Sequence, residues 1–244
     1  MVDLGILRYY IYAVAPLQVL VFIVTYRKVR EAWEKLPAMS WKTISFLLGL
    51  LAILVASIME FPFLISNSLA GFFLLGIFVG PIEEFSKLLP VKLYREEKWK
   101  LWKKTIGAAF FFGLIEGSLY ALILLIVGEH LMALYRVFLV AFHVALTFVT
   151  VTHYLVKESW SGYLRASLYH SLYDLPLLVF VGGYRGPYLK ALMGLGLLMV
   201  ALLIVDVLRT APLVEELIPR EEEEVKERPL PSPVAVDEEL TSSP

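Results

Sequence analysis

Polar and ionisable side chains interrupt four apolar segments of this chain, and their types could support hydrolysis. They lie in residues 69–91, 105–127, 131–156 and 161–182 and comprise Glu83, Glu84, Lys87, Glu116, Arg136, His143, Thr147, His170 and Asp174. An ionised side chain at the centre of a membrane helix costs about 2.5–3.5 kcal/mol, so these groups should face one another or water. Carboxylates and imidazoles can take a proton from water and return it to a leaving group. The pattern predicts a site for acid–base chemistry.

The spacing within each motif also has a chemical meaning. On a helix, Glu83 and Glu84 point about 100° apart, so one can face a cavity while the other supports a neighbouring helix. Lys87 is close enough in sequence to pair with either of them, and Asp174 lies one helical turn beyond His170. Pro81 removes a backbone donor just before the glutamates and can kink the helix.

The composition places these residues in a membrane protein. The 244 residues are 59% apolar and 18% charged, with no cysteine. A soluble domain has roughly 25% charged residues, so a soluble globular enzyme is excluded. The Lys and Arg residues lie between apolar runs instead of on one face, which excludes a nucleic-acid binder. Without cysteine, a thiol nucleophile is also excluded.

Seven segments are long and apolar enough to span a bilayer, which needs about 20 residues each. They are residues 6–26, 43–63, 69–91, 105–127, 131–156, 161–182 and 187–208. Backbone groups in lipid must be satisfied within each segment, so these segments should be helices. We therefore expect an all-α, polytopic membrane helix bundle over residues 1–211, with the motifs in 69–181. Residues 212–244, which are acidic and rich in proline, should form a disordered cytoplasmic tail.

Basic residues alternate between the connections and predict the orientation. Residues 27–42 and 92–104 are rich in Lys and Arg, whereas 64–68 and 128–130 have none. Basic loops stay in the cytoplasm, so the N-terminus should lie outside and the C-terminus inside a multi-pass cell-membrane protein.

Helix rise places the polar residues at similar depths. Measured from the basic side, Glu83 should lie roughly 12–13 Å, His170 about 14 Å, Glu116 about 16 Å and His143 about 20 Å deep. This common depth favours one intramembrane site, although Glu83 with Lys87 could instead be a structural ion pair and a single His could be an interhelical hydrogen bonder. We expect Arg136 to be a structural partner of an acidic group. Glu60 and Asp206 lie near segment ends and receive no role.

Four motifs in order resemble a known family. Glu83-Glu84-x-x-Lys87, Phe112-x-x-x-Glu116, Arg136 with His143 and Thr147, and His170-x-x-x-Asp174 resemble the motif series of PrsW-type intramembrane proteases. These are similar to the wider superfamily of CAAX prenyl endopeptidases and bacteriocin-processing enzymes. The CAAX enzymes have Glu-Glu-x-x-x-Arg, a His in place of Glu116 and usually an Asn in place of Asp174, so the resemblance favours the PrsW branch over prenylated substrates.

The resemblance implies a water activated by a glutamate, with no cofactor required. Glu83 would be the base and Glu84 its orienting partner, and His170 would position the water or protonate the leaving amine. Asp174 would orient His170 or contact the oxyanion, while Glu116 and His143 would complete the cavity wall. Lys87, Arg136 and Thr147 would support the site.

A metal-dependent version of the same protease stays open, because His and Glu are common ligands of catalytic zinc. A bound Zn²⁺ would be held by Glu83, His143 and His170.

The expected partners are a membrane protein or peptide substrate, cut near the cytoplasmic side, and the lipid bilayer. The resemblance suggests regulatory substrates such as membrane-anchored anti-sigma factors. The sequence does not indicate an oligomeric state. Two other classes remain: a proton- or cation-coupled transporter, because such groups also form relays, and a membrane scaffold that docks partners through its acidic tail.

Overall fold

The computed structural model describes residues 5–219 of the 244-residue chain, and residues 1–4 and 220–244 lie outside the described part. The described residues are helical and contain no strand. The helices are α1 (Gly5–Lys35), α2 (Lys42–Ile65), α3 (Leu69–Lys87), α4 (Leu89–Leu93), α5 (Lys98–Ile126), α6 (His130–Lys157), α7 (Ser161–Val181), α8 (Tyr188–Thr210) and the 3₁₀ helix η1 (Ala211–Leu217). The all-α membrane bundle expected from the sequence is confirmed.

Six of the described helices are long and apolar enough to cross a membrane: α1, α2, α3, α5, α6 and α8. The segment 161–182, expected to be a seventh span, forms α7 but does not meet this criterion by itself. Arg165, His170 and Asp174 lower its hydropathy, and most of its side chains are buried. Because other helices shield α7 from lipid, it can carry polar residues at little cost.

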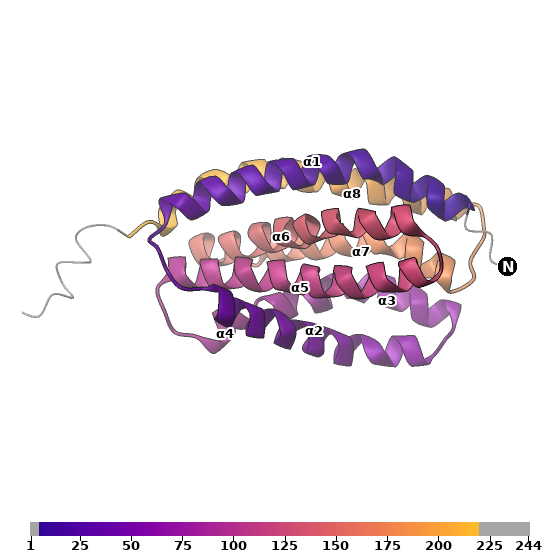
Figure 1. The fold of residues 1–244 in the computed structure, drawn as a ribbon, viewed down its shortest axis with the longest axis horizontal. Coiled ribbons are helices and arrows are strands. Elements are labelled where there is room, and N and C mark those ends of the chain that lie inside the picture. The colour runs from indigo at the N-terminus through magenta and orange to yellow at the C-terminus, as the bar shows by residue number, and fades with distance from the viewer. Residues whose placement is uncertain (1–4, 220–244) are drawn as a thin grey trace, which may run out of the picture.

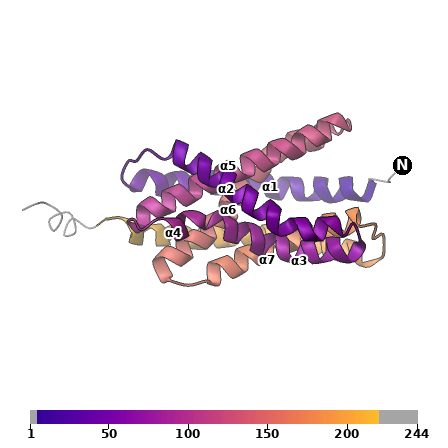
Figure 2. The same cartoon turned by 90° about the horizontal axis from the view of Figure 1, so that it is seen from below.

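The helices pack side by side along one common direction (Figure 1). At the centre, α6 contacts α1, α5, α7 and α8, and α7 also packs against α3 and α8. On one side α1 lies along α8, and on the other α2 packs against α3 and α5. Seen from below, the hairpin tip where α5 meets α6 stands away from α2, α3 and α7 (Figure 2).

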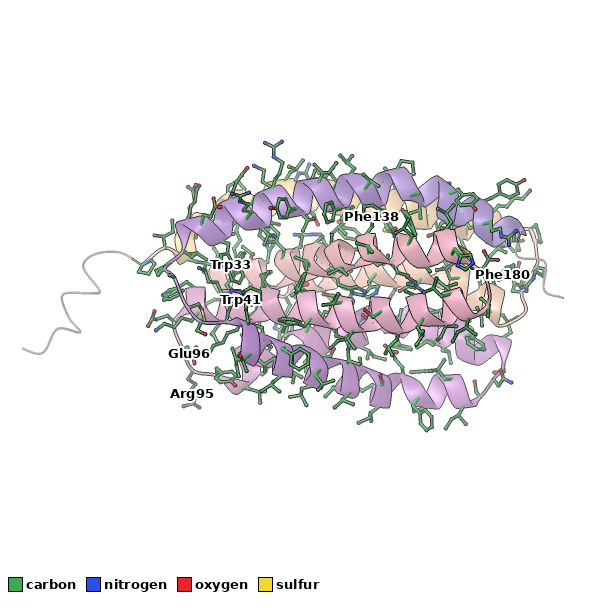
Figure 3. The ribbon with its side chains drawn as sticks, in the orientation of Figure 1. Trp33, Trp41, Arg95, Glu96, Phe138 and Phe180 are labelled. Carbon is green, nitrogen blue, oxygen red and sulfur yellow. The ribbon has the colours of Figure 1, made fainter. Side chains whose placement is uncertain are left out.

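Basic and aromatic residues mark one end of the bundle. Trp33, Trp41, Arg95 and Glu96 lie at this end, which we call the basic end, and Phe180 lies at the other (Figure 3). The buried Lys103 amino group donates hydrogen bonds to the carbonyls of Leu36 and Pro37, at 3.1 and 2.7 Å. These bonds fasten the start of α5 to the connection between α1 and α2.

Several helix boundaries differ from the expected ones, and two of them have a clear physical reason. α5 begins at Lys98 instead of 105, because its first turns are rich in lysine but pack through the fully buried Trp102. α3 ends at Lys87 instead of 91, since Pro90 cannot donate the hydrogen bond that would continue it.

The tail predicted from residue 212 begins later. Residues 211–217 form η1, in which Val214 and Leu217 are buried. The rest of the predicted tail, residues 220–244, lies outside the described residues.

Candidate functional site

A glycine brings α3 and α7 into direct contact beside the two glutamates. A Cβ atom placed on Gly80 would lie 2.1 Å from the carbonyl oxygen of Ser167 and 2.7 Å from the Ser171 hydroxyl. Only glycine fits this approach, so Gly80 sets the distance between the helix that bears Glu83 and the one that bears His170. The close approach also puts α7 within hydrogen-bond reach of the α3 backbone.

The helix α3 continues through the proline next to it. Pro81 has no N–H group, so the Ile77 carbonyl lacks its usual partner within the helix. The Ser171 hydroxyl of α7 donates a hydrogen bond to this carbonyl at 2.7 Å. The Tyr163 hydroxyl donates to the Pro81 carbonyl at 2.9 Å. Polar groups of α7 therefore satisfy the α3 backbone where the proline interrupts it.

The Lys87 ammonium lies at the centre of the buried polar cluster. Its Nζ atom is 3.1 Å from Glu83 Oε2, 2.8 Å from Glu84 Oε1 and 2.9 Å from His143 Nδ1. Lys87 and Glu84 are 0% exposed, so neither charge is shared with solvent. The predicted pairing of Lys87 is confirmed, and it involves both glutamates.

Contact with Lys87 determines which nitrogen of His143 carries the proton. An ammonium group can only donate, so Nδ1 must accept from Lys87 and the proton of a neutral ring must sit on Nε2. Nε2 lies 2.8 Å from Glu116 Oε2. The imidazole of His143 therefore lies between the Lys87 ammonium, which donates to it, and the Glu116 carboxyl group, which its Nε2 atom faces.

His170 contacts a carboxylate through each ring nitrogen. Nε2 lies 3.1 Å from Asp174 Oδ2, on the same helical face as predicted, and Nδ1 lies 3.3 Å from Glu84 Oε1. The Thr147 hydroxyl donates to the other oxygen of Glu84 at 3.2 Å. The four motifs thus meet in one cluster, as their common depth predicts.

A cavity of about 620 Å³ borders this cluster. Glu83, Glu116 and Asp174 line it, together with Glu60 and Arg136. The two histidines are not among the lining residues. The expectation that His143 completes the cavity wall is therefore wrong: His143 lies behind Glu116, and His170 lies behind Asp174.

Arg136 forms no direct ion pair among the described residues, but its charge acts on the Glu116 carboxyl group at the same cavity. Its guanidinium instead lies over the Tyr120 ring, 4.5 Å from the centroid, at the cavity wall.

Glu60 is the cavity residue that sequence reasoning missed. Its Oε1 atom is buried and has no hydrogen-bond partner within residues 5–219. The signal was present in the sequence, because Ser57, Glu60 and Leu64 repeat at helical spacing within an apolar span and all three line the cavity.

Asp206, which received no role, is a structural residue. Its Oδ2 accepts hydrogen bonds from Arg165 Nε at 2.7 Å and from the Tyr169 hydroxyl at 2.9 Å. These two hydrogen bonds link α7 to α8 outside the cavity.

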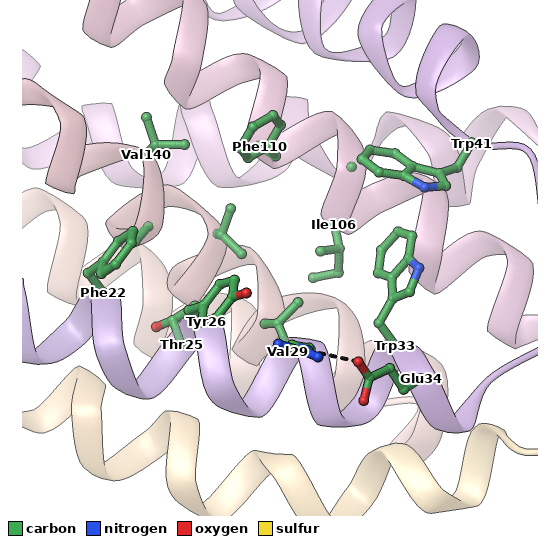
Figure 4. A pocket seen from close by; sticks show the side chains of 14 residues that line it. Phe22, Thr25, Tyr26, Val29, Trp33, Glu34, Trp41, Ile106, Phe110 and Val140 are labelled. Carbon is green, nitrogen blue, oxygen red and sulfur yellow. Dashed lines mark hydrogen bonds and ion pairs between the residues drawn. The ribbon is translucent and has the colours of Figure 1, made fainter.

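A second cavity, of about 430 Å³, lies between α1, α5 and α6 near the basic end (Figure 4). Phe22, Trp33 and Phe110 are among its apolar walls, and the ion pair between Arg30 and Glu34, at 2.7 Å, lies on it. It holds no acid–histidine pair, so the first cavity is the candidate site.

Glu83, His143 and His170 satisfy the first requirement of a metal centre. One donor atom from each lies within 4.8 Å of the other two, and a carboxylate with two imidazoles is a donor set that suits zinc. The Lys87 ammonium, however, lies against two of these three residues.

Comparisons with known proteins leave the chain without an assigned relative. No family model, no curated protein and no solved structure matches it.

Proposed function

We propose that this protein is an intramembrane endopeptidase in which Glu83 activates a water molecule. The observation that supports this most is the place of the Glu83 carboxylate. It lines the cavity, and its Oε2 atom lies 3.1 Å from Lys87 Nζ, 3.6 Å from His143 Nδ1 and 3.7 Å from His170 Nε2. A base needs access to water on one side and fixed partners on the other, and this carboxylate has both.

The cluster provides for each proton of peptide hydrolysis. Glu83 would take a proton from a water in the cavity as the water oxygen attacks the peptide carbonyl carbon. The carbon–nitrogen bond of the tetrahedral intermediate would then break, and the leaving amine would need a proton. Glu83, which holds the proton taken from the water, would return it to the amine, and Asp174, which lines the cavity and contacts His170, would orient the imidazole beside it.

The charge of Arg136 would act on the developing oxyanion. Its guanidinium lines the cavity beside Tyr120. Glu116 lines the cavity too and lies 2.8 Å from His143 Nε2, so in its protonated form it would donate to the oxyanion. Fixed charges aimed at an oxyanion in a site of low dielectric stabilise it more strongly than water does.

The lining of the cavity favours a membrane segment as substrate. Most lining residues are apolar, and they extend from Glu83 toward Leu64, Ile123 and Val181, at the end opposite the basic end. We propose that a segment of a membrane protein enters the cavity from that end and is cut there. The sequence had led us to expect cleavage near the cytoplasmic side. The motif resemblance to PrsW-type proteases points to regulatory membrane proteins.

Purified protein in liposomes with a library of membrane peptides tests this function. Glu83→Gln should reduce cleavage at least about 100-fold, because a general base contributes that much or more. Asp206→Asn is the matched control, since it also removes a buried acid of the bundle but lies outside the cavity, and it should retain cleavage. A chelator should have no effect. Cleavage by Glu83→Gln at the wild-type rate would contradict the proposal.

One observation favours a second candidate, a cation-coupled transporter. Four carboxylates line the same cavity, those of Glu60, Glu83, Glu116 and Asp174, and such groups bind protons or cations in transporters. Proton and cation flux across the same liposomes separates the two candidates. If the wild type carries a flux that Glu83→Gln loses, and the wild type cleaves no peptide, the protein is a transporter and not a protease.

A further inference from the structure

The ammonium group at the centre of the cluster stands where a divalent cation would bind. We propose that Lys87 is the resident cation of this site: it occupies the place between Glu83 and His143, and thereby keeps zinc-like metals out of an otherwise complete Glu83–His143–His170 centre.

The three residues come close to metal-binding geometry. At zinc–ligand distances of about 2.0–2.2 Å, tetrahedral ligand atoms lie about 3.3–3.6 Å apart. Glu83 Oε2 lies 3.6 Å from His143 Nδ1 and 3.7 Å from His170 Nε2. Small side-chain shifts would close these distances around one ion.

The outer contacts of the two imidazoles match those of metal ligands. Histidines that bind a metal usually present their other nitrogen to a carboxylate. His143 presents Nε2 to Glu116 at 2.8 Å, and His170 presents Nδ1 to Glu84 at 3.3 Å. His143 Nδ1 and His170 Nε2 are then the atoms that a metal would take, and His170 Nε2 would give up its contact with Asp174 Oδ2, at 3.1 Å, to do so.

Lys87 makes this centre inaccessible to a metal in two ways. Its ammonium donates to His143 Nδ1 at 2.9 Å, so it uses the lone pair that a metal would need. It also lies 3.1 Å from Glu83 Oε2 and is fully buried, so its charge would repel a dication a few ångströms away with little screening.

The charge of the cluster explains why a cation must be there. Glu83 and Glu84 are buried neighbours, and two carboxylates without a cation would repel each other in the bundle interior. Lys87 contacts both of them. Without the ammonium group, the two carboxylates would lack a counter-ion, and Glu83, His143 and His170 could bind a metal cation in its place.

For hydrolysis, this inference rests on the proposed function: the protease would work without metal because Lys87 already supplies the positive charge. The metal-binding part rests on geometry alone and needs no substrate.

Titration of the purified protein with Co²⁺ tests the inference, because tetrahedral Co²⁺ with nitrogen and oxygen ligands absorbs visible light. We expect Lys87→Met to bind Co²⁺ at least about 100-fold more tightly than wild type, as like-charge repulsion at this distance predicts. Zn²⁺ should displace the Co²⁺ and raise the unfolding temperature of the variant. Lys87→Arg, which keeps a cation, should exclude the metal as wild type does.

Lys103→Met is the matched control. Lys103 is another buried lysine, but it bonds to the backbone carbonyls of Leu36 and Pro37 at the basic end, away from the cluster. Lys103→Met should therefore show no visible absorption from bound Co²⁺. A second variant pair, His143→Ala with Lys87→Met, should lose the binding gained by Lys87→Met.

If Lys87→Met does not fold, Glu84→Gln with Lys87→Met replaces it, since this pair removes one charge of each sign and keeps all three ligands. Equal Co²⁺ affinity in wild type and the variant would overturn the inference. So would a folded variant that does not bind Co²⁺, or binding that survives the loss of His143. A wild type that cleaves no peptide would contradict the proposed function but leave this result unaffected.

Discussion

At the scale of single residues, Glu60 is the group whose role can be measured most directly. Its carboxylate lines the cavity and has one buried oxygen without a partner in the described part of the chain. A turn of this side chain toward the cavity would let that oxygen accept an N–H group of a substrate backbone. Glu60→Gln replaces one carboxyl oxygen by an amide group and keeps the shape.

We expect Glu60→Gln to lower kcat/KM about 2- to 10-fold, mainly through KM, because a hydrogen bond contributes about 0.5–1.5 kcal/mol net. Initial rates over a range of peptide concentrations measure this effect. Glu129→Gln is the control, since Glu129 pairs with Arg8 outside the cavity and should leave the kinetics unchanged. An unchanged KM in Glu60→Gln would remove Glu60 from the substrate contacts.

Thr147 illustrates a residue that supports the site through another. Its hydroxyl donates to Glu84, which is fully buried, so Thr147→Val leaves one carboxylate oxygen short of a donor. The free energy of unfolding should fall by about 1–3 kcal/mol. Denaturant unfolding in detergent micelles measures it.

Thr150→Val is the matched variant for this test. Thr150 is equally buried, but its hydroxyl bonds only to the Leu146 carbonyl of its own helix. Thr150→Val should lower the free energy of unfolding less than Thr147→Val does. Equal costs would mean that the contact with Glu84 contributes nothing of its own.

At the scale of elements, Pro81 and Ser171 couple α3 to α7. Ser171→Ala removes the donor that satisfies the Ile77 carbonyl, and should lower the free energy of unfolding by about 1–3 kcal/mol. Pro81→Ala restores the backbone N–H that bonds to the same carbonyl. The double variant should therefore lose less than the sum of the two single variants, which a double-mutant cycle measures. Strict additivity would show that Ser171 does not act through the proline.

At the scale of the whole molecule, the direction of the cavity is open to test because the chain has no cysteine. A single cysteine at Ser57, in the cavity, should react with a thiol reagent that cannot cross the membrane when it is added to intact cells. Ser66→Cys, at the same end of the bundle, should react likewise. Lys157→Cys, at the basic end, should react only after the cells are permeabilised. Labelling of Ser57→Cys that requires permeabilisation would place the cavity mouth on the cytoplasmic side.

The sequence predicted the membrane bundle and the convergence of the motifs, because both depend on hydropathy and helical periodicity. The sequence led us to expect α7 to be apolar enough to span the membrane by itself, which it is not. Neighbouring helices shield it, and such shielding is a property of packing. The cavity contact of Glu60, and the fact that Arg136 forms no direct ion pair within residues 5–219, depend on how α2 and α6 are rotated about their axes. The proton position on His143 depends on Lys87, 56 residues away in sequence, and only the folded structure shows that contact.

The position of Lys87 also has a consequence for pharmacology. Inhibitors with hydroxamates or related metal-binding groups act on zinc hydrolases because these groups donate electron pairs to the metal. With an ammonium group at that point, such compounds gain no coordination bond, and their usual potency should be absent. A mimic of the tetrahedral diol, able to accept from Arg136 and donate to Glu83, is the scaffold from which to design selective ligands for this protein.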